Sequence, residues 1–101
     1  MDLLTVVRYY GDQIQDDRGE AEIFLHGVDE MHELNDEVLK SVCNKPPGED
    51  GVVGEAIDVM LCMADLINKH TKNSFTEEQF NDYVHKKCRK WLDKKQGTYQ
   101  A

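Results

Sequence analysis

The chain has little proline and cysteine, no long apolar run and a shortage of basic residues. Its 101 residues include 2 prolines, adjacent at positions 46 and 47. No apolar run approaches the roughly 18–20 residues that span a bilayer, and the N-terminus lacks the basic and apolar regions of a secretory signal. The 12 basic residues against 20 acidic ones leave a net charge of −8. Because nucleic-acid-binding proteins carry a basic surface, we expect neither a membrane nor a nucleic-acid partner.

The cysteines exclude two further classes of protein. Cys43, Cys62 and Cys88 are odd in number and far apart, and no CxxC or Cys/His spacing is present. A disulfide framework and a zinc site both need paired or clustered ligands. We therefore expect reduced thiols and a cytoplasmic location.

The remaining pattern predicts four helices and no strand. The first covers residues 3–14, and Asp17 and Glu20 have capping-box spacing for a second that ends near residue 42. The adjacent prolines must break the chain there. A third helix runs from residue 50 or 51 to about 70. Thr76 and Gln79 have capping-box spacing for a fourth, which Gly97 stops after about residue 95.

These elements predict an all-α, four-helix bundle with one domain over residues 1–97 and a frayed tail at 98–101. Apolar residues cover about two-thirds of the helical wheel of the third helix, so it must be largely buried. A domain of about 100 residues has a thin core. We therefore expect an oligomer that covers part of this surface.

Acidic side chains form stripes on the second and third helices. Glu30, Glu33 and Glu37 share one stripe, with His26 one turn earlier, and Glu55 and Asp58 lie on the polar stripe of the apolar third helix. Buried carboxylates need a cation or a proton. If the two helices pack antiparallel, an oxygen cage for Mg²⁺, or Mn²⁺ as a substitute, can form. Such a cage is typical of a phosphate-ester or nucleotide site.

Purely structural interpretations of the same residues compete with a metal site. Acidic residues three apart often form only a solvated face. Glu37 and Asp65 extend the two stripes as further metal contacts or as solvated acids, and we favour solvated acids. Trp91 and Tyr83 are interpreted as core or interface residues rather than a base-stacking platform. Residues 1–65 sum to −12 and residues 66–101 to +4. The basic cluster over residues 86–95 is either a solvated face or a phosphate-binding surface.

Two acidic pairs, Glu30-x-x-Glu33 and Glu55-x-x-Asp58, are separated by 21 residues. This pattern resembles the ExxE(12–28)ExxD signature of MazG-like nucleoside triphosphate pyrophosphohydrolases. The segments 27–34 and 54–62 resemble the two motif helices of short, phage-encoded and stand-alone members. The resemblance implies Mg²⁺-dependent hydrolysis of an NTP or dNTP to the monophosphate and pyrophosphate, by attack of an activated water on the α-phosphorus. It favours purine deoxynucleotides, and it implies a role in nucleotide-pool control or house-cleaning.

The resemblance also assigns roles to individual residues. It makes Glu30, Glu33, Glu55 and Asp58 the metal ligands and catalytic carboxylates, and it implies a homodimer or homotetramer. Lys87 or Lys90 corresponds to the basic residue that meets the phosphates. His26, by its position one turn before Glu30, either lines the base pocket, supports a ligand carboxylate or is only a partly exposed histidine beside the apolar face. The alternatives are a dUTPase-like activity of the same superfamily and a non-catalytic acidic interaction protein.

Overall fold

The computed structural model describes residues 2–15 and 17–97, and within these ranges it contains four helices and no strand. The all-α prediction is confirmed, and the tail predicted at residues 98–101 lies outside the described residues. The helix bounds match the sequence pattern closely. The helices are α1 (Leu3–Ile14), α2 (Glu20–Val42), α3 (Gly51–His70) and α4 (Glu77–Gln96).

The start of α2 differs from the prediction. Gly19, not Asp17, is the N-cap, and its backbone N–H donates to Oε1 of Glu22 at 3.4 Å. The predicted Asp17–Glu20 capping box is therefore wrong by two residues. The spacing of three residues is kept, because a side chain at the third helical position reaches back to the backbone N–H of the N-cap residue.

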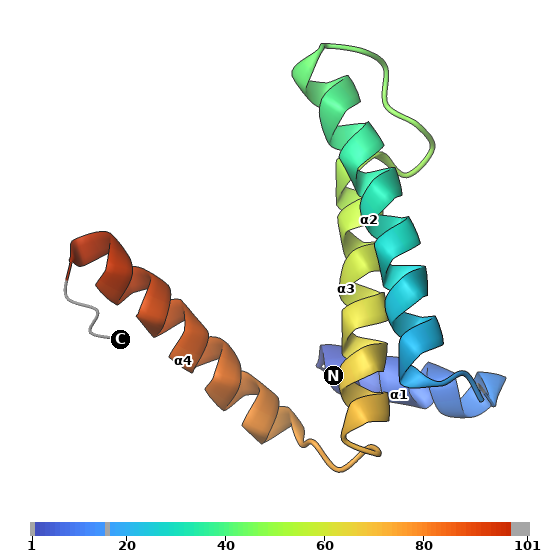
Figure 1. The fold of residues 1–101 in the computed structure, drawn as a ribbon, viewed down its shortest axis with the longest axis vertical. Coiled ribbons are helices and arrows are strands. Elements are labelled where there is room, and N and C mark those ends of the chain that lie inside the picture. The colour runs from blue at the N-terminus through green and yellow to red at the C-terminus, as the bar shows by residue number, and fades with distance from the viewer. Residues whose placement is uncertain (1, 16, 98–101) are drawn as a thin grey trace.

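The centre of the molecule is an antiparallel hairpin of α2 and α3 (Figure 1). Its loop is held by Glu37, which accepts hydrogen bonds from the backbone N–H of Gly48 at 2.6 and 3.3 Å. Glu37 is buried, with 6% of its surface exposed. Our interpretation of Glu37 as a solvated acid is therefore wrong, because the N–H groups of a loop that folds back on its helix also require acceptors.

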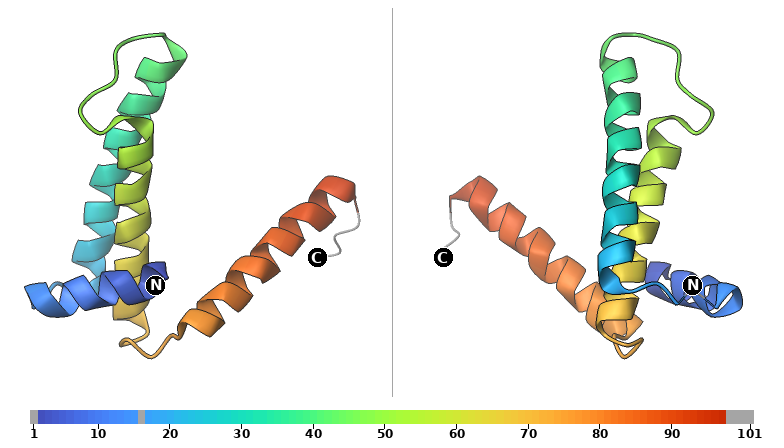
Figure 2. Two further views of the ribbon diagram at one scale, coloured as in Figure 1. Left: turned by 180° about the vertical axis from the view of Figure 1, so that it is seen from behind. Right: turned by 45° about the vertical axis from the view of Figure 1, so that its right-hand side comes forward.

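Helix α1 crosses the C-terminal half of α3 and closes that end of the hairpin (Figure 2). Leu4 is fully buried at the crossing, and its carbonyl accepts a hydrogen bond from Nδ2 of Asn68 at 3.1 Å. Arg8 donates to Oδ1 of Asn68 and to the carbonyl of Phe75, both at 2.8 Å. These bonds fix α1 to the end of α3 and to the loop that follows it.

Helix α4 points away from the other three helices in every view (Figures 1 and 2). Its first turn has the predicted capping box, in which Gln79 N–H donates to Thr76 Oγ1 at 3.1 Å and Thr76 N–H donates to Gln79 Oε1 at 2.9 Å. Asp2 N–H donates to Oε1 of Glu77 at 3.2 Å and so ties the base of α4 to α1. Beyond that base the single chain does not close the predicted bundle.

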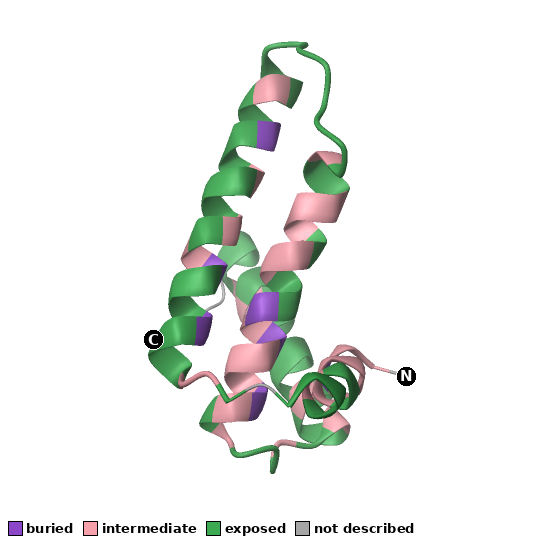
Figure 3. Ribbon diagram, turned by 90° about the vertical axis from the view of Figure 1, so that its right-hand side faces the viewer, coloured by how far each residue is buried: buried purple, intermediate pink, exposed green. Residues whose placement is uncertain are grey.

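Few of the described residues are buried, and they lie in the narrow seam between α2 and α3 and where α1 crosses α3 (Figure 3). Among the described residues, the buried apolar side chains are those of Leu4, Ile23, Cys62 and Ala64. Within the same residues, no helix has the length and apolar character needed to cross a membrane. The seam between α2 and α3 is also where the acidic stripes meet.

Candidate metal centre

Three carboxylates from two helices converge in the seam between α2 and α3. Glu30 comes from α2, and Glu55 and Asp58 come from α3. One oxygen of each lies within 4.8 Å of the other two, and all three residues are partly buried. Gly27 lies one turn before Glu30, and the flexible end of the Met63 side chain fills the space beside it, with Cε 2.6 Å from where a Cβ would lie. The helices thus bring together three of the four carboxylates that the sequence predicted.

Two oxygens of this cluster are buried without a hydrogen-bond partner among the described residues. They are Oε2 of Glu30 and Oε2 of Glu55. Burial raises the pKa of the Glu55 carboxyl above its ordinary value, and the charges of Glu33 and Asp58 raise it further. Burial likewise raises the pKa of Glu30, and the nearby Glu33 carboxyl adds to that shift. Without a proton or a cation, such a group of carboxylates destabilises the fold.

The other oxygen of Glu30 is held by a chain of hydrogen bonds that begins before α2. Arg18 lies 3.0 Å from Nδ1 of His26, and Nε2 of His26 lies 3.1 Å from Oε1 of Glu30. Because arginine can only donate, Nδ1 accepts and Nε2–H donates to Glu30 in the neutral tautomer. Arg18 also donates to Oδ2 of Asp65 at 3.1 Å. This chain orients Glu30 so that its second oxygen remains available to the cluster.

His26 thus bonds to Glu30, the contact expected from one of its three sequence interpretations. Arg18 was not among the residues that the sequence predicted. Arg18 lies in the short connection before α2, where neither helical periodicity nor a motif marks it. Asp65, interpreted from the sequence as a solvated acid, instead forms an ion pair with Arg18. Its place on the same polar stripe of α3 as Asp58 was the available signal.

Glu33 lies at the edge of the cluster rather than among its three closest oxygens. The residue is exposed, yet it contributes to the raised pKa of both Glu30 and Glu55. Glu33 is therefore close enough to interact with both carboxylates while remaining accessible to solvent. This position differs from that of the three partly buried residues.

The two predicted lysines lie on α4. Lys87 lines a groove between α3 and α4, and Lys90 follows one turn later on the same helix. Neither is among the groups that shift the pKa of Glu30 or Glu55. Within the described part of one chain, α4 therefore does not bring these two charges to the carboxylates.

The chemistry of the cluster fits a hard divalent cation. All the atoms that could coordinate a cation are carboxylate oxygens, the class of ligand that Mg²⁺ and Mn²⁺ prefer. Cys62 lies beside the cluster but is a poor ligand, because burial raises the pKa of its thiol and keeps it protonated. The two unpartnered oxygens are the observation that calls for a cation.

Comparison with known proteins adds no relative. No protein-family model matches the chain, and neither the curated proteins nor the solved structures contain a match.

Proposed function

We propose that the chain is a Mg²⁺-dependent pyrophosphohydrolase that converts an NTP or dNTP to the monophosphate and pyrophosphate. The preferred substrates in this proposal are purine deoxynucleotides. The convergence of Glu30, Glu55 and Asp58, with two buried oxygens lacking partners, carries the proposal. The resemblance of the two acidic motifs to those of MazG-like enzymes supports the reaction class. In the reaction, a water oxygen bonds to the α-phosphorus, the bond to the bridging oxygen breaks, and pyrophosphate leaves.

Each side chain has a distinct part in this proposal. Glu30, Glu55 and Asp58 would hold the cation, with Glu33 adjacent. A bound Mg²⁺ supplies charge neutralisation for the phosphates and lowers the pKa of water. His26 is a positioning residue, because it bonds to Glu30 rather than to the reacting atoms. Glu33, exposed at the edge of the cluster, is the carboxylate best placed to accept a proton from the attacking water.

The test is pyrophosphate release across a panel of NTPs and dNTPs, dUTP included, with Mg²⁺ and with chelator. We expect Glu55→Gln and Asp58→Asn each to reduce turnover by at least about 100-fold. Glu78→Gln on α4 and Asp36→Asn on α2 make the same chemical changes at exposed positions and should retain activity. Full turnover in a folded Asp58→Asn variant would contradict the proposal.

Two results of the panel would point to the alternatives. Turnover of dUTP alone would favour the dUTPase-like activity. The absence of turnover with every nucleotide, together with no stabilisation of the native protein by Mg²⁺ and a non-hydrolysable nucleotide, would favour the acidic interaction protein. A ligand that binds the native state must raise its stability.

A further inference from the structure

A small cavity opens between α1 and the α2–α3 hairpin, beside the candidate metal centre. Its volume is about 340 Å³. His26 lines this cavity, and Nε2 of the same side chain lies 3.1 Å from Oε1 of Glu30. Cys62 also lines it, and this residue follows Asp58 by one turn of α3. A molecule in the cavity would therefore be separated from the carboxylates by little more than one side chain.

The walls of the cavity are mostly apolar and come largely from α1. Val6, Tyr10 and Ile14 follow one another at intervals of four residues, so they lie on one face of α1. Leu61 contributes to the wall from α3. A cavity with apolar walls and a few polar groups is typical of a site for a small molecule. Hydrogen bonds join three polar residues of the lining, Arg18, His26 and Asp65.

Tyr10 supplies an aromatic ring to this cavity. The side chain is 61% exposed, so much of the ring is accessible to a ligand. Tyr9 makes an edge-on contact with Tyr10, with the ring centroids 5.4 Å apart. Aromatic side chains bind nucleobases by stacking, which typically strengthens binding by about 5- to 140-fold for one base. An accessible ring in a hollow beside a carboxylate cluster therefore suits the base of a nucleotide.

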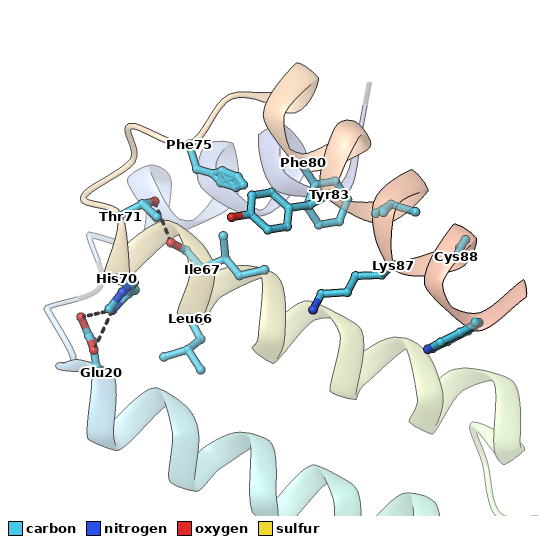
Figure 4. A pocket seen from close by; sticks show the side chains of 12 residues that line it. Glu20, Leu66, Ile67, His70, Thr71, Phe75, Phe80, Tyr83, Lys87 and Cys88 are labelled. Atoms are coloured by element: carbon cyan, nitrogen blue, oxygen red, sulfur yellow. Dashed lines mark hydrogen bonds and ion pairs between the residues drawn. The ribbon is translucent and has the colours of Figure 1, made fainter. Parts of the chain in front are cut away.

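The larger apolar groove, between α3 and α4, is less suited to a substrate of the metal centre. It has a volume of about 750 Å³, and Figure 4 shows Phe75 and Tyr83 in it above Ile67. Among the described residues that line this groove there is no carboxylate of the cluster, and His26 is absent as well. The smaller cavity is therefore the one that adjoins the carboxylates.

We propose that the cavity between α1 and the hairpin binds the base of the nucleotide, with Tyr10 stacked on it, while the phosphates lie at the carboxylate cluster. In a nucleotide the sugar separates the base from the α-phosphate, and here the His26 side chain separates the cavity from Glu30. This inference rests on the proposed function and adds the residues that hold the base. The lining comes from α1, the connection before α2, α2 and α3 of one chain.

The first test is titration calorimetry with Mg²⁺ and two probes, the α,β-methylene analogue of dATP and inorganic tripolyphosphate. The analogue cannot release pyrophosphate, because carbon replaces its bridging oxygen, and tripolyphosphate has no base. We expect Tyr10→Ala to weaken binding of the analogue by about 5- to 140-fold and to leave the affinity for tripolyphosphate unchanged. Tyr83→Ala is the matched control and should change neither affinity, since Tyr83 is 54% exposed and also has one edge-on aromatic neighbour.

The second test fills the cavity from Gly11, which is part of its lining. Apart from its chain neighbours and the backbone of α1, a Cβ at this position would meet no atom of the described residues within 4 Å. Gly11→Ala should therefore retain binding of both probes. Gly11→Phe places a ring in the same space and should remove most of the affinity that the base adds. Circular dichroism checks that each variant keeps its helices.

Three results would overturn the base site. They are equal affinities of wild type and Tyr10→Ala for the dATP analogue, equal losses in Tyr10→Ala and Tyr83→Ala, and unchanged affinity for the analogue in Gly11→Phe. If tripolyphosphate still binds with Mg²⁺, each of these results leaves the metal centre of the proposed function intact. Failure of the wild type to bind either probe would instead overturn the proposed function, and this inference with it.

Discussion

At the scale of single residues, the candidate site depends on how one carboxylate is held. Glu30 has one oxygen bonded to His26 and the other buried without a partner. His26 is in turn positioned by Arg18. Partners of this kind orient a ligand carboxylate before the cation arrives, which reduces the entropy lost on binding.

Replacing His26 tests this orientation. We expect His26→Ala to weaken Mn²⁺ or Mg²⁺ binding by about 10- to 100-fold, as is typical for the loss of a supporting hydrogen bond. The measurement is titration calorimetry with the metal alone. His32→Ala is the matched control, since His32 is also exposed and on α2. Equal affinities of wild type and His26→Ala would refute the positioning role.

The raised pKa values of Glu30 and Glu55 predict how the stability of the metal-free protein depends on pH. Because both pKa values are raised above the ordinary 4.5, the folded state binds these two protons more tightly than the unfolded chain. Their contribution to the free energy of unfolding therefore rises as pH falls from the raised values to 4.5. Above the raised values the contribution is fully destabilising.

Urea denaturation in chelator from about pH 8 to about pH 5 measures this contribution. Other groups also titrate, so the comparison is with the double variant Glu30→Gln/Glu55→Gln. The variant should be more stable than wild type at neutral pH, and the difference should shrink on acidification. A difference that stays constant across the range would be incompatible with the raised pKa values.

At the scale of elements, the α2–α3 hairpin carries the site and the Glu37 contact closes its loop. The carboxylate of Glu37 holds the N–H of Gly48 and lies 3.6 Å from Nζ of Lys40. This contact fixes where α3 starts relative to α2. It therefore affects the register at which Glu55 and Asp58 face Glu30.

Truncating Glu37 should lower the free energy of unfolding more than truncation of a solvated acidic residue would. Glu37→Ala leaves a part-buried N–H without its acceptor, and we expect a loss of about 1–3 kcal/mol in the free energy of unfolding. Glu37→Gln keeps an acceptor oxygen and should recover part of the loss. Asp36→Ala, at the exposed neighbouring position, should change stability by less than about 0.5 kcal/mol. Chemical denaturation of the three variants measures these free energies. Equal losses in the free energy of unfolding for Asp36→Ala and Glu37→Ala would show that the loop contact contributes nothing.

At the scale of the whole molecule, the chain is an open arrangement rather than a closed bundle. The hairpin and α1 bury a narrow seam, and α4 is attached to them mainly at its base. This geometry separates the acidic hairpin from the basic helix within one chain.

Much of the fold could be predicted from the sequence, because its signals are local. The helix limits follow from the adjacent prolines, the Thr76–Gln79 box and Gly97, whose backbone is in the left-handed region at φ 75°. The i, i+3 carboxylate pairs follow from helical periodicity alone. The start of α2 was the exception, since glycine offers no side-chain signal for a cap.

By itself, the sequence determined which residues form helices and which acids share a stripe, because both depend on neighbours within about four positions. Only the tertiary structure decided which of those acids meet. It placed Glu30 with Glu55 and Asp58, left Glu33 at the edge and turned Glu37 into a support for the loop. It also linked Arg18 to His26 and pointed α4 away from the hairpin. These outcomes depend on how two helices are rotated against each other, which is set by packing and by buried groups that need partners.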